Sequence, residues 1–371
     1  MRALSLDSQD VRNGASMARR GRGRDRSIHN TSQPRVRNWL FAFAFVVAFL
    51  IVFGGFVRLT RSGLSIVEWN PVSGTVPPIG EAAWQSEFAK YQQTPEFQHV
   101  NSTMTLEEYK YIFYIEWLHR LIARFAGLFY AVPLFYFLGR RMIPLREAPA
   151  YVVGGLLFLG QAFAGWYMVS SGLIDRPSVS HFRLTIHLLL ALALLALALW
   201  LALDHHYGRA PRRIPTKLSR YAGAALVVLI LQISYGGLTA GLKAGLLADT
   251  WPLLVGALVP PGVLTRPGDL LLSPVTILFI HRWLAFAGLI LAPLLYWYAR
   301  SRSYSPEIQR GLAGLAIVVV LQLLLGILTV VRHVEITVAL AHQANAVLLV
   351  ALSVFTLHRL GAPGARTSAS T

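Results

Sequence analysis

Residues 38–56, NWLFAFAFVVAFLIVFGGF, form an unbroken stretch of the chain that carries no charged side chain. An α-helix of about 20 apolar residues is long enough to cross the roughly 30 Å hydrocarbon core of a bilayer. Residues 184–203, LTIHLLLALALLALALWLAL, have the same character. Because lipid supplies no hydrogen-bond partners to the backbone, stretches of this kind cross the membrane as helices.

Six further stretches have similar length and composition. The chain of 371 residues is 55% hydrophobic and only 14% charged, which is too apolar for a soluble protein of this length. We therefore predict an all-α integral membrane protein without a sizeable soluble domain. The eight predicted transmembrane helices are residues 38–57, 116–138, 149–170, 182–203, 220–241, 276–299, 310–331 and 336–357.

The net charge of +17 is distributed unevenly along the chain. The two terminal tails and the loops near 139–148, 204–220 and 299–310 carry 22 of the 34 basic residues. Because cytoplasmic loops of membrane proteins are enriched in Lys and Arg, this pattern indicates topology rather than nucleic-acid binding. It predicts cytoplasmic termini in a bacterial inner membrane, or termini in the matrix if the membrane is mitochondrial. The long loop 58–115 then lies outside.

The two halves of the chain resemble each other. GGFVRLTRSGL (54–64) aligns with GGLTAGLKAGL (236–246), and HRLIARFAG (119–127) aligns with HRWLAFAG (281–288) with one gap. Each half contains four predicted helices, so the repeats are parallel and sites in both halves face the same side of the membrane. The predicted units are an N-terminal tail (1–37), two four-helix bundles (38–203 and 220–357), an inner linker (204–219) and a C-terminal tail (358–371).

Four of the 11 histidines lie inside predicted membrane helices, near the outer end of each: His119, His187, His281 and His342. Ionisable residues inside a bilayer usually mark a functional site, and neutral imidazole is a good axial ligand for haem iron. The repeat pairs His119 with His187 and His281 with His342, which predicts two bis-His sites. The other histidines are expected to be solvated or interfacial: His29, His99, His181, His205, His206, His333 and His358.

The absence of cysteine excludes disulfides, thiolate metal sites, Fe–S clusters and covalently attached c-type haem. Copper and zinc also bind imidazole. However, wide apolar and aromatic surroundings suit a porphyrin better than a bare ion. The aromatic residues in question are Phe125, Phe129, Trp283 and Phe286.

Three arginines lie at the depth of these histidines. Arg120 and Arg282 directly follow His119 and His281, and Arg58 follows the first predicted helix. Their guanidinium groups are candidates to bind haem propionates, with snorkelling to lipid headgroups as the alternative. Three glutamines each precede a glycine by four residues and are expected to serve ordinary helix packing: Gln161, Gln232 and Gln322.

The two halves differ at one position. Glu116 lies three residues before His119, on the same face of a helix, whereas Leu278 lies three residues before His281. A carboxylate beside one haem site can accept a proton or stabilise developing positive charge. The alternative is that Glu116 only favours the helix N-terminus through the helix dipole.

At these residues the chain resembles the haem A synthase family over about residues 38–357. The stretches that carry the resemblance are GGFVRLTRSGLSIVEWNPVSGTVPP (54–78), EWLHRLIARFAG (116–127), IHRWLAFAG (280–288) and AHQANAVLLV (341–350). The resemblance implies an oxidoreductase that converts the C8 methyl group of haem O to a formyl group through a hydroxymethyl intermediate. The product, haem A, serves cytochrome oxidase. Without cysteine, the chain is similar to the class found in α-proteobacteria and mitochondria.

The resemblance also implies roles for the two halves. His281 and His342 would hold a resident haem B, and His119 and His187 would bind the substrate haem beside the catalytic Glu116. The implied partners are a haem O synthase, cytochrome oxidase assembly factors, an electron acceptor and other copies of this chain. The aromatic segment 84–100 is a candidate cap over the substrate site, or a helix that packs on the outer surface without function.

Two alternatives stay open at this point. A transmembrane carrier of electrons from quinol would also need four histidines in helices, but such carriers usually place their haems on opposite sides of the membrane. A haem-binding assembly factor without catalytic activity would need a haem site but not Glu116.

Overall fold

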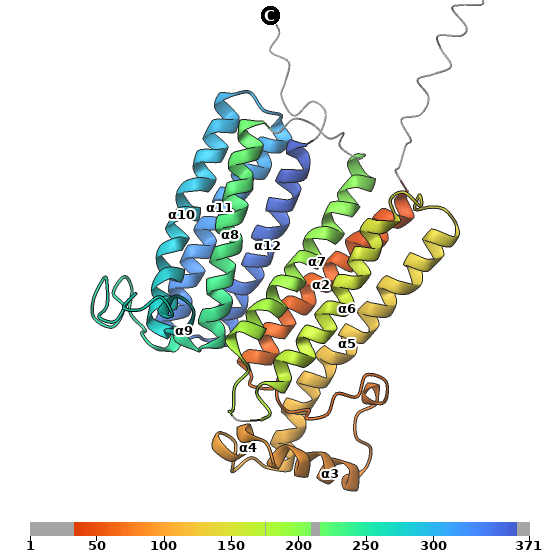
Figure 1. Cartoon of the computed structure of the whole chain (residues 1–371), viewed down its shortest axis with the longest axis vertical. Coiled ribbons are helices and arrows are strands. Elements are labelled where there is room, and N and C mark those ends of the chain that lie inside the picture. The colour runs from red at the N-terminus through yellow and green to blue at the C-terminus, as the bar shows by residue number, and fades with distance from the viewer. Residues whose placement is uncertain (1–32, 175, 209–215, 362–371) are drawn as a thin grey trace, which may run out of the picture.

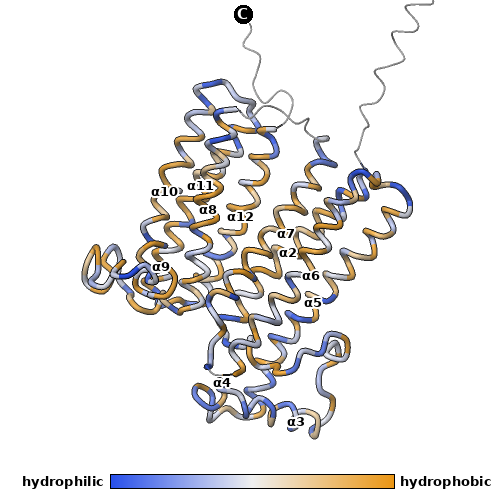
Figure 2. Tube along the Cα trace, viewed as in Figure 1, coloured by the Kyte–Doolittle hydropathy of each residue, from blue (hydrophilic) through white to orange (hydrophobic). Residues whose placement is uncertain are grey.

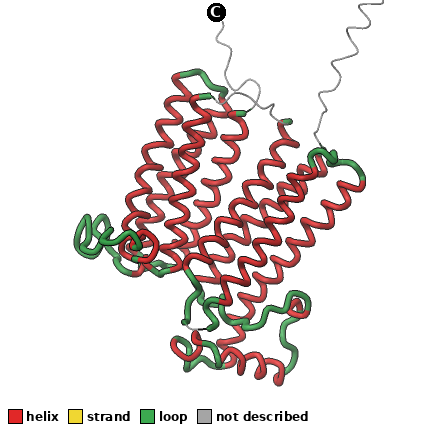
Figure 3. Tube along the Cα trace, in the orientation of Figure 1, coloured by secondary structure: helices red, strands yellow, loops and turns green. Residues whose placement is uncertain are grey.

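The computed structural model describes residues 33–174, 176–208 and 216–361. Within these ranges the chain consists of helices joined by loops, with no strand (Figure 3). Eight of the described helices are long and apolar enough to cross a membrane, which confirms the prediction of an all-α, multi-pass membrane protein. They are α2 (Pro34–Leu59), α5 (Leu106–Gly139), α6 (Ala148–Ser170), α7 (His181–Tyr207), α8 (Lys217–Gly241), α10 (Pro274–Ser301), α11 (Pro306–Val331) and α12 (Ile336–Leu360).

The long helices lie in two groups, α2 with α5, α6 and α7, and α8 with α10, α11 and α12 (Figure 1). Apolar residues run along the middle of the helices (Figure 2). The long segments that follow α2 and α8 emerge at the same end of the molecule. The first contains α3 (Glu81–Gln92) and α4 (Pro95–His99), and the second contains α9 (Asp269–Leu272).

Helix α5 begins ten residues before the predicted start at 116. Thr105 caps it, because its hydroxyl accepts a hydrogen bond from the Glu108 backbone and the Glu108 carboxylate accepts one from the Thr105 backbone. Such caps contribute about 1 kcal/mol each. The added turns pack on α3 and α4, and together these segments form the α3–α4 cap. Its buried aromatic and aliphatic residues are Trp84, Tyr91, Tyr109, Ile112 and Phe113.

The two groups meet through α2 and α7 on one side and α8 and α12 on the other. A Cβ at Gly55 of α2 would clash with Gln343 of α12, and a Cβ at Gly237 of α8 would come within 2.8 Å of the Thr185 hydroxyl of α7. The Gln343 amide also donates a hydrogen bond to the Ile51 carbonyl at 2.6 Å. Small residues allow this close approach of helix backbones.

At the opposite end of the helices, two histidines are buried, contrary to the expectation of solvated side chains. His205 is 3% exposed and lies 2.7 Å from the Tyr151 hydroxyl, while His358 is 1% exposed and lies 3.0 Å from Asp204. His181 is also buried. These side chains are not solvated, because segments far apart in sequence supply their partners. The exposed histidines are His99, His206 and His333, and His29 lies outside the described residues.

Candidate functional site

Each of the four predicted iron-ligand histidines lies against a glycine of the preceding long helix. A Cβ at any of these glycines would lie only 2.9–3.3 Å from the imidazole ring, so the rings need a residue without a Cβ beside them. The same relation occurs twice in each half of the chain. The pairs are His119 with Gly54, His187 with Gly165, His281 with Gly236, and His342 with Gly326.

A glutamine one turn before the glycine contacts three of these histidines. The Gln161 amide lies 3.3 Å from the His187 ring, Gln232 lies 3.2 Å from His281, and Gln322 lies 3.2 Å from His342. The corresponding residue before Gly54 is Leu50. The prediction that these glutamines serve ordinary helix packing leaves out their contact with the histidines, although their regular spacing before a glycine is a signal of it.

The rings of His281 and His342 lie with their centres 6.5 Å apart and their planes at 80°. An imidazole binds a metal through nitrogen at about 2 Å, which places two axial rings on one iron with their centres roughly 6 Å apart. The observed spacing therefore fits two axial ligands of one haem iron. No three His, Asp or Glu side chains gather as metal ligands in the described ranges. A porphyrin iron, which needs only axial ligands from protein, suits this donor set better than a bare ion.

His119 and His187 form the corresponding pair in the first half. The Phe53 ring lies 5.8 Å from the His119 ring, centre to centre. The structure thus brings His281 and His342 together, and His119 and His187 occupy the corresponding positions beside glycines in the first half. Their role as iron ligands stays a prediction.

The Glu116 carboxylate is 3% exposed and has hydrogen-bond donors on both oxygens. The Ser65 hydroxyl and the Ile66 backbone donate to Oε2 at 2.7 and 2.9 Å. The Arg120 guanidinium donates to Oε1 through Nη2 at 2.6 Å and Nε at 3.1 Å. Charge-assisted hydrogen bonds of this kind are among the stronger ones in proteins. Glu116 therefore binds the loop after α2 to α5 and has a fixed orientation.

Two arginines extend this contact along the same face of α5. Arg120 donates to the Glu68 carbonyl at 3.2 Å, and Arg124 donates to the Pro71 carbonyl at 3.0 Å. Residues four apart lie on one face of a helix, so Glu116, Arg120 and Arg124 form a continuous stripe that binds residues 65–71. His119, which lies between Glu116 and Arg120 in sequence, faces Gly54 of α2 instead.

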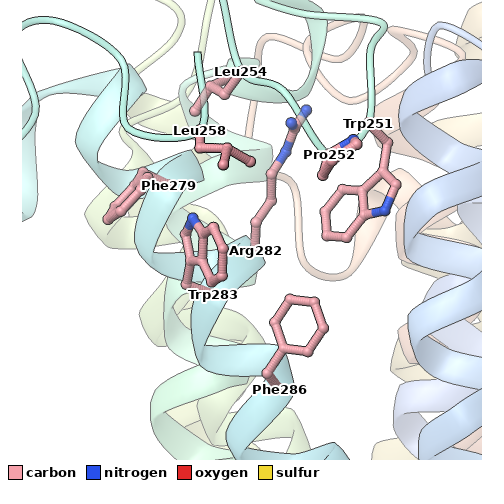
Figure 4. A pocket seen from close by; sticks show the side chains of 8 residues that line it. All are labelled: Trp251, Pro252, Leu254, Leu258, Phe279, Arg282, Trp283 and Phe286. Atoms are coloured by element: carbon pink, nitrogen blue, oxygen red, sulfur yellow. The ribbon is translucent and has the colours of Figure 1, made fainter.

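Arg282 holds the corresponding loop of the second half. Its Nη1 donates to the Thr250 and Leu253 carbonyls, both at 3.2 Å, and its guanidinium lies 5.8 Å from the Trp251 ring. Arg282 is only 7% exposed, yet its Nε and Nη2 have no hydrogen-bond partner. Figure 4 shows the side chain rising from α10 into an otherwise apolar pocket. The pocket is lined by Trp251, Pro252, Leu254, Leu258, Phe279, Arg282, Trp283 and Phe286.

Arg58, the third predicted propionate ligand, donates a hydrogen bond to the Ala240 carbonyl at the end of α8. It therefore joins the two groups of helices. Arg58 and Arg120 both have protein partners, and Arg282 differs from them in its two unpaired nitrogens. Propionate binding by these arginines stays a prediction.

Glu96 in α4 carries a buried carboxyl group that no pattern in the sequence predicts. It is 5% exposed, and its Oε2 has no hydrogen-bond partner. Burial, with a smaller contribution from the charge of Glu116, raises the pKa of Glu96 to about 7, while Lys243 and Arg61 oppose this shift. These two cations occupy corresponding positions in the two repeats. A glutamate in the first turn of a short helix is common, so the sequence gave no signal of its burial.

Comparisons with known proteins identify the family of this chain. The family described as cytochrome oxidase assembly protein matches residues 37–354. A heme A synthase of Novosphingobium aromaticivorans is 44% identical over 338 residues, which cover 87% of this chain and 94% of the relative. Heme A synthases of Sphingopyxis alaskensis (42% identical; 90% and 94% covered) and Rhodospirillum centenum (40%; 88% and 88%) are also similar. Because this similarity extends over most of both chains, the chain belongs to the haem A synthase family of cytochrome oxidase assembly proteins.

Proposed function

We propose that the chain is a membrane-bound haem A synthase, an oxidoreductase that converts the C8 methyl group of haem O to a formyl group through a hydroxymethyl intermediate. Its family membership supports this function. The observation that carries the proposal is the presence of two repeat-related histidine pairs with a buried carboxylate beside only one of them. The carboxylate gives one of the two proposed haem sites an acid–base group that the other does not have.

In the second half, residues 220–357, we assign His281 and His342 as the residues that would hold a resident haem B. The 6.5 Å separation of their rings supports this assignment. Gly236 and Gly326 have no side chains that would displace the two rings from this position. Haem B bound there would supply one-electron transfer between the substrate site and an external electron acceptor.

In the first half, residues 38–203, we assign His119 and His187 to the iron of the substrate haem and Glu116 as the catalytic carboxylate. The donors from Ser65, Ile66 and Arg120 fix the orientation of Glu116. An oriented carboxylate can accept a proton or stabilise positive charge at the reacting carbon. Arg120 acts through Glu116 and is therefore a positioning residue.

The cellular setting follows from the family and the charge pattern. The bacterial relatives favour a bacterial plasma membrane over a mitochondrial one, and the basic tails favour cytoplasmic termini. Both histidine pairs then lie toward the outer face. A haem O synthase would supply the substrate, and cytochrome oxidase assembly factors would receive the product. We also propose that copies of this chain associate with one another in the membrane.

The test is the haem content of the purified full-length protein, measured by reversed-phase chromatography with mass detection. It should be compared for the wild type, Glu116→Ala and Glu107→Ala. Glu107 is an exposed carboxylate on the same helix and serves as the matched control. The wild type and the control should contain haem B together with haem A or its precursors.

Glu116→Ala should accumulate haem O or the hydroxymethyl species without haem A, because the substrate can still bind between the histidines. Two haem B molecules per chain in all three proteins would contradict a synthase. That result would instead favour a bis-haem electron carrier.

A further inference from the structure

The arginines that follow the two ligand histidines share one contact, made through Nη1, and differ in whether their other two nitrogens have a partner. Arg120 Nη1 donates to the Glu68 carbonyl, and Arg282 Nη1 donates to the Thr250 carbonyl, each at 3.2 Å. Arg120 directs Nε and Nη2 at the Glu116 carboxylate, at 3.1 and 2.6 Å. In Arg282 these same two nitrogens are buried without a partner.

The cause of the difference is the residue one turn earlier. The residue that corresponds to Glu116 in the second half is Leu278, which is 2% exposed and packs in an apolar cluster with Ala244 and Leu254. It cannot accept a hydrogen bond. Leaving two donors of a buried cation unpaired is strongly unfavourable, so the geometry calls for an anion at this place. The neighbouring walls, Trp251 and Trp283, are aromatic.

We infer that Arg282 binds a carboxylate of the resident haem, at the place where Glu116 already binds Arg120, so that one haem site retains its haem and the other releases it. The inference rests on the proposed function, which places haem B between His281 and His342. A carboxylate matches the two adjacent N–H groups of an arginine, which it can bind in bidentate fashion. The Arg282 side chain begins one residue from the iron ligand His281.

In the first half, the corresponding arginine nitrogens are not available to a haem carboxylate. Glu116 occupies the Arg120 nitrogens that a substrate propionate would otherwise use. Glu116 is thus an internal competitor of the substrate carboxylate, in addition to its proposed part in the reaction. A substrate site must release its product in every cycle, whereas a site for a prosthetic group must not. A single Glu-to-Leu difference between the repeats produces both properties.

The test is the rate at which haem leaves the purified full-length protein for an excess of apomyoglobin, followed by absorbance. Leu278→Glu places a carboxylate against Arg282, and Leu278→Gln is the control of equal size without charge. We expect Leu278→Glu to release haem B roughly tenfold to a hundredfold faster than the wild type, the range for one charged hydrogen bond. Leu278→Gln should release it within about threefold of the wild-type rate.

Equal release rates in the wild type and both Leu278 variants would overturn the inference. If Leu278→Glu does not fold, Glu116→Leu decides instead. It frees Arg120 and should slow the release of haem O or its hydroxymethyl product by a similar factor, and an unchanged rate overturns the inference. A His281→Ala variant separates the two proposals. Haem B that survives this change refutes the assignment of haem B to His281 and His342, and the inference with it. Haem B that depends on His281 but ignores Leu278→Glu refutes the inference alone.

Discussion

Replacing Glu96 with glutamine should stabilise the protein above neutral pH and have little effect near pH 5. Burial and the charge of Glu116 raise the pKa of Glu96 from 4.5 to about 7, against the opposing charges of Lys243 and Arg61. Between these two values the folded protein keeps the proton that the unfolded chain releases. Because the unfolded state then binds fewer protons, the stability of the wild type falls as the pH rises through this window.

The size of the effect follows from the shift in pKa. A rise from 4.5 to about 7 is roughly 2.5 units, and each unit corresponds to about 1.36 kcal/mol, so the loss is about 3 kcal/mol. It is absent below the unfolded pKa and complete above the folded pKa. Glutamine keeps the shape of the side chain without the titratable proton, so the variant should not show this loss.

The assay is thermal unfolding of the full-length protein in detergent between about pH 5 and pH 8. The wild type, Glu96→Gln and Glu107→Gln should be compared. Glu107 is 80% exposed and pairs only with Lys110 on the same helix turn, so its removal should leave the pH profile of the wild type unchanged. Parallel profiles for the wild type and Glu96→Gln would refute a raised pKa at Glu96.

Two further substitutions test the packing around the histidines. Gly236→Ala would place a Cβ 3.0 Å from the His281 ring and should lower haem B content severalfold through a steric cost of about 1–3 kcal/mol. Gly288→Ala, whose Cβ has no neighbour closer than 3.9 Å, should retain haem, and equal loss in both would argue against the ring contact. Asp204→Asn should destabilise the protein by about 1–3 kcal/mol in thermal unfolding, because it weakens the partner of the buried His358. An unchanged melting temperature would show that this pair contributes little.

The membrane helices were predictable because their signal is local. A stretch such as residues 38–56 must be helical in lipid whatever surrounds it. The first turns of α5 were missed because Glu107, Glu108 and Lys110 make them polar on average. Their apolar residues pack against α3 instead of lipid, and only the folded loop supplies that surface.

The paired histidines were predictable for a different reason, which is that the repeat shows each of them twice. Their polar surroundings were not. Glu116 binds Ser65, which is 51 residues away, and His358 binds Asp204, which is 154 residues away. No local pattern reports such a contact, because it depends on how the helices pack. Arg282 also required the structure, since its unpaired nitrogens appear only when its neighbours are known.

The junction between the two groups of helices has a consequence for how the chain could have arisen. The first helix of each half packs on the last helix of the other, with Gly55 and Gly237 at corresponding contacts. This is the arrangement of a dimer of identical subunits about a two-fold axis. In such a dimer every substitution appears at both sites, so neither site can change alone. In a single polypeptide that restriction does not apply, so corresponding positions of the two halves can differ, as Glu116 and Leu278 do.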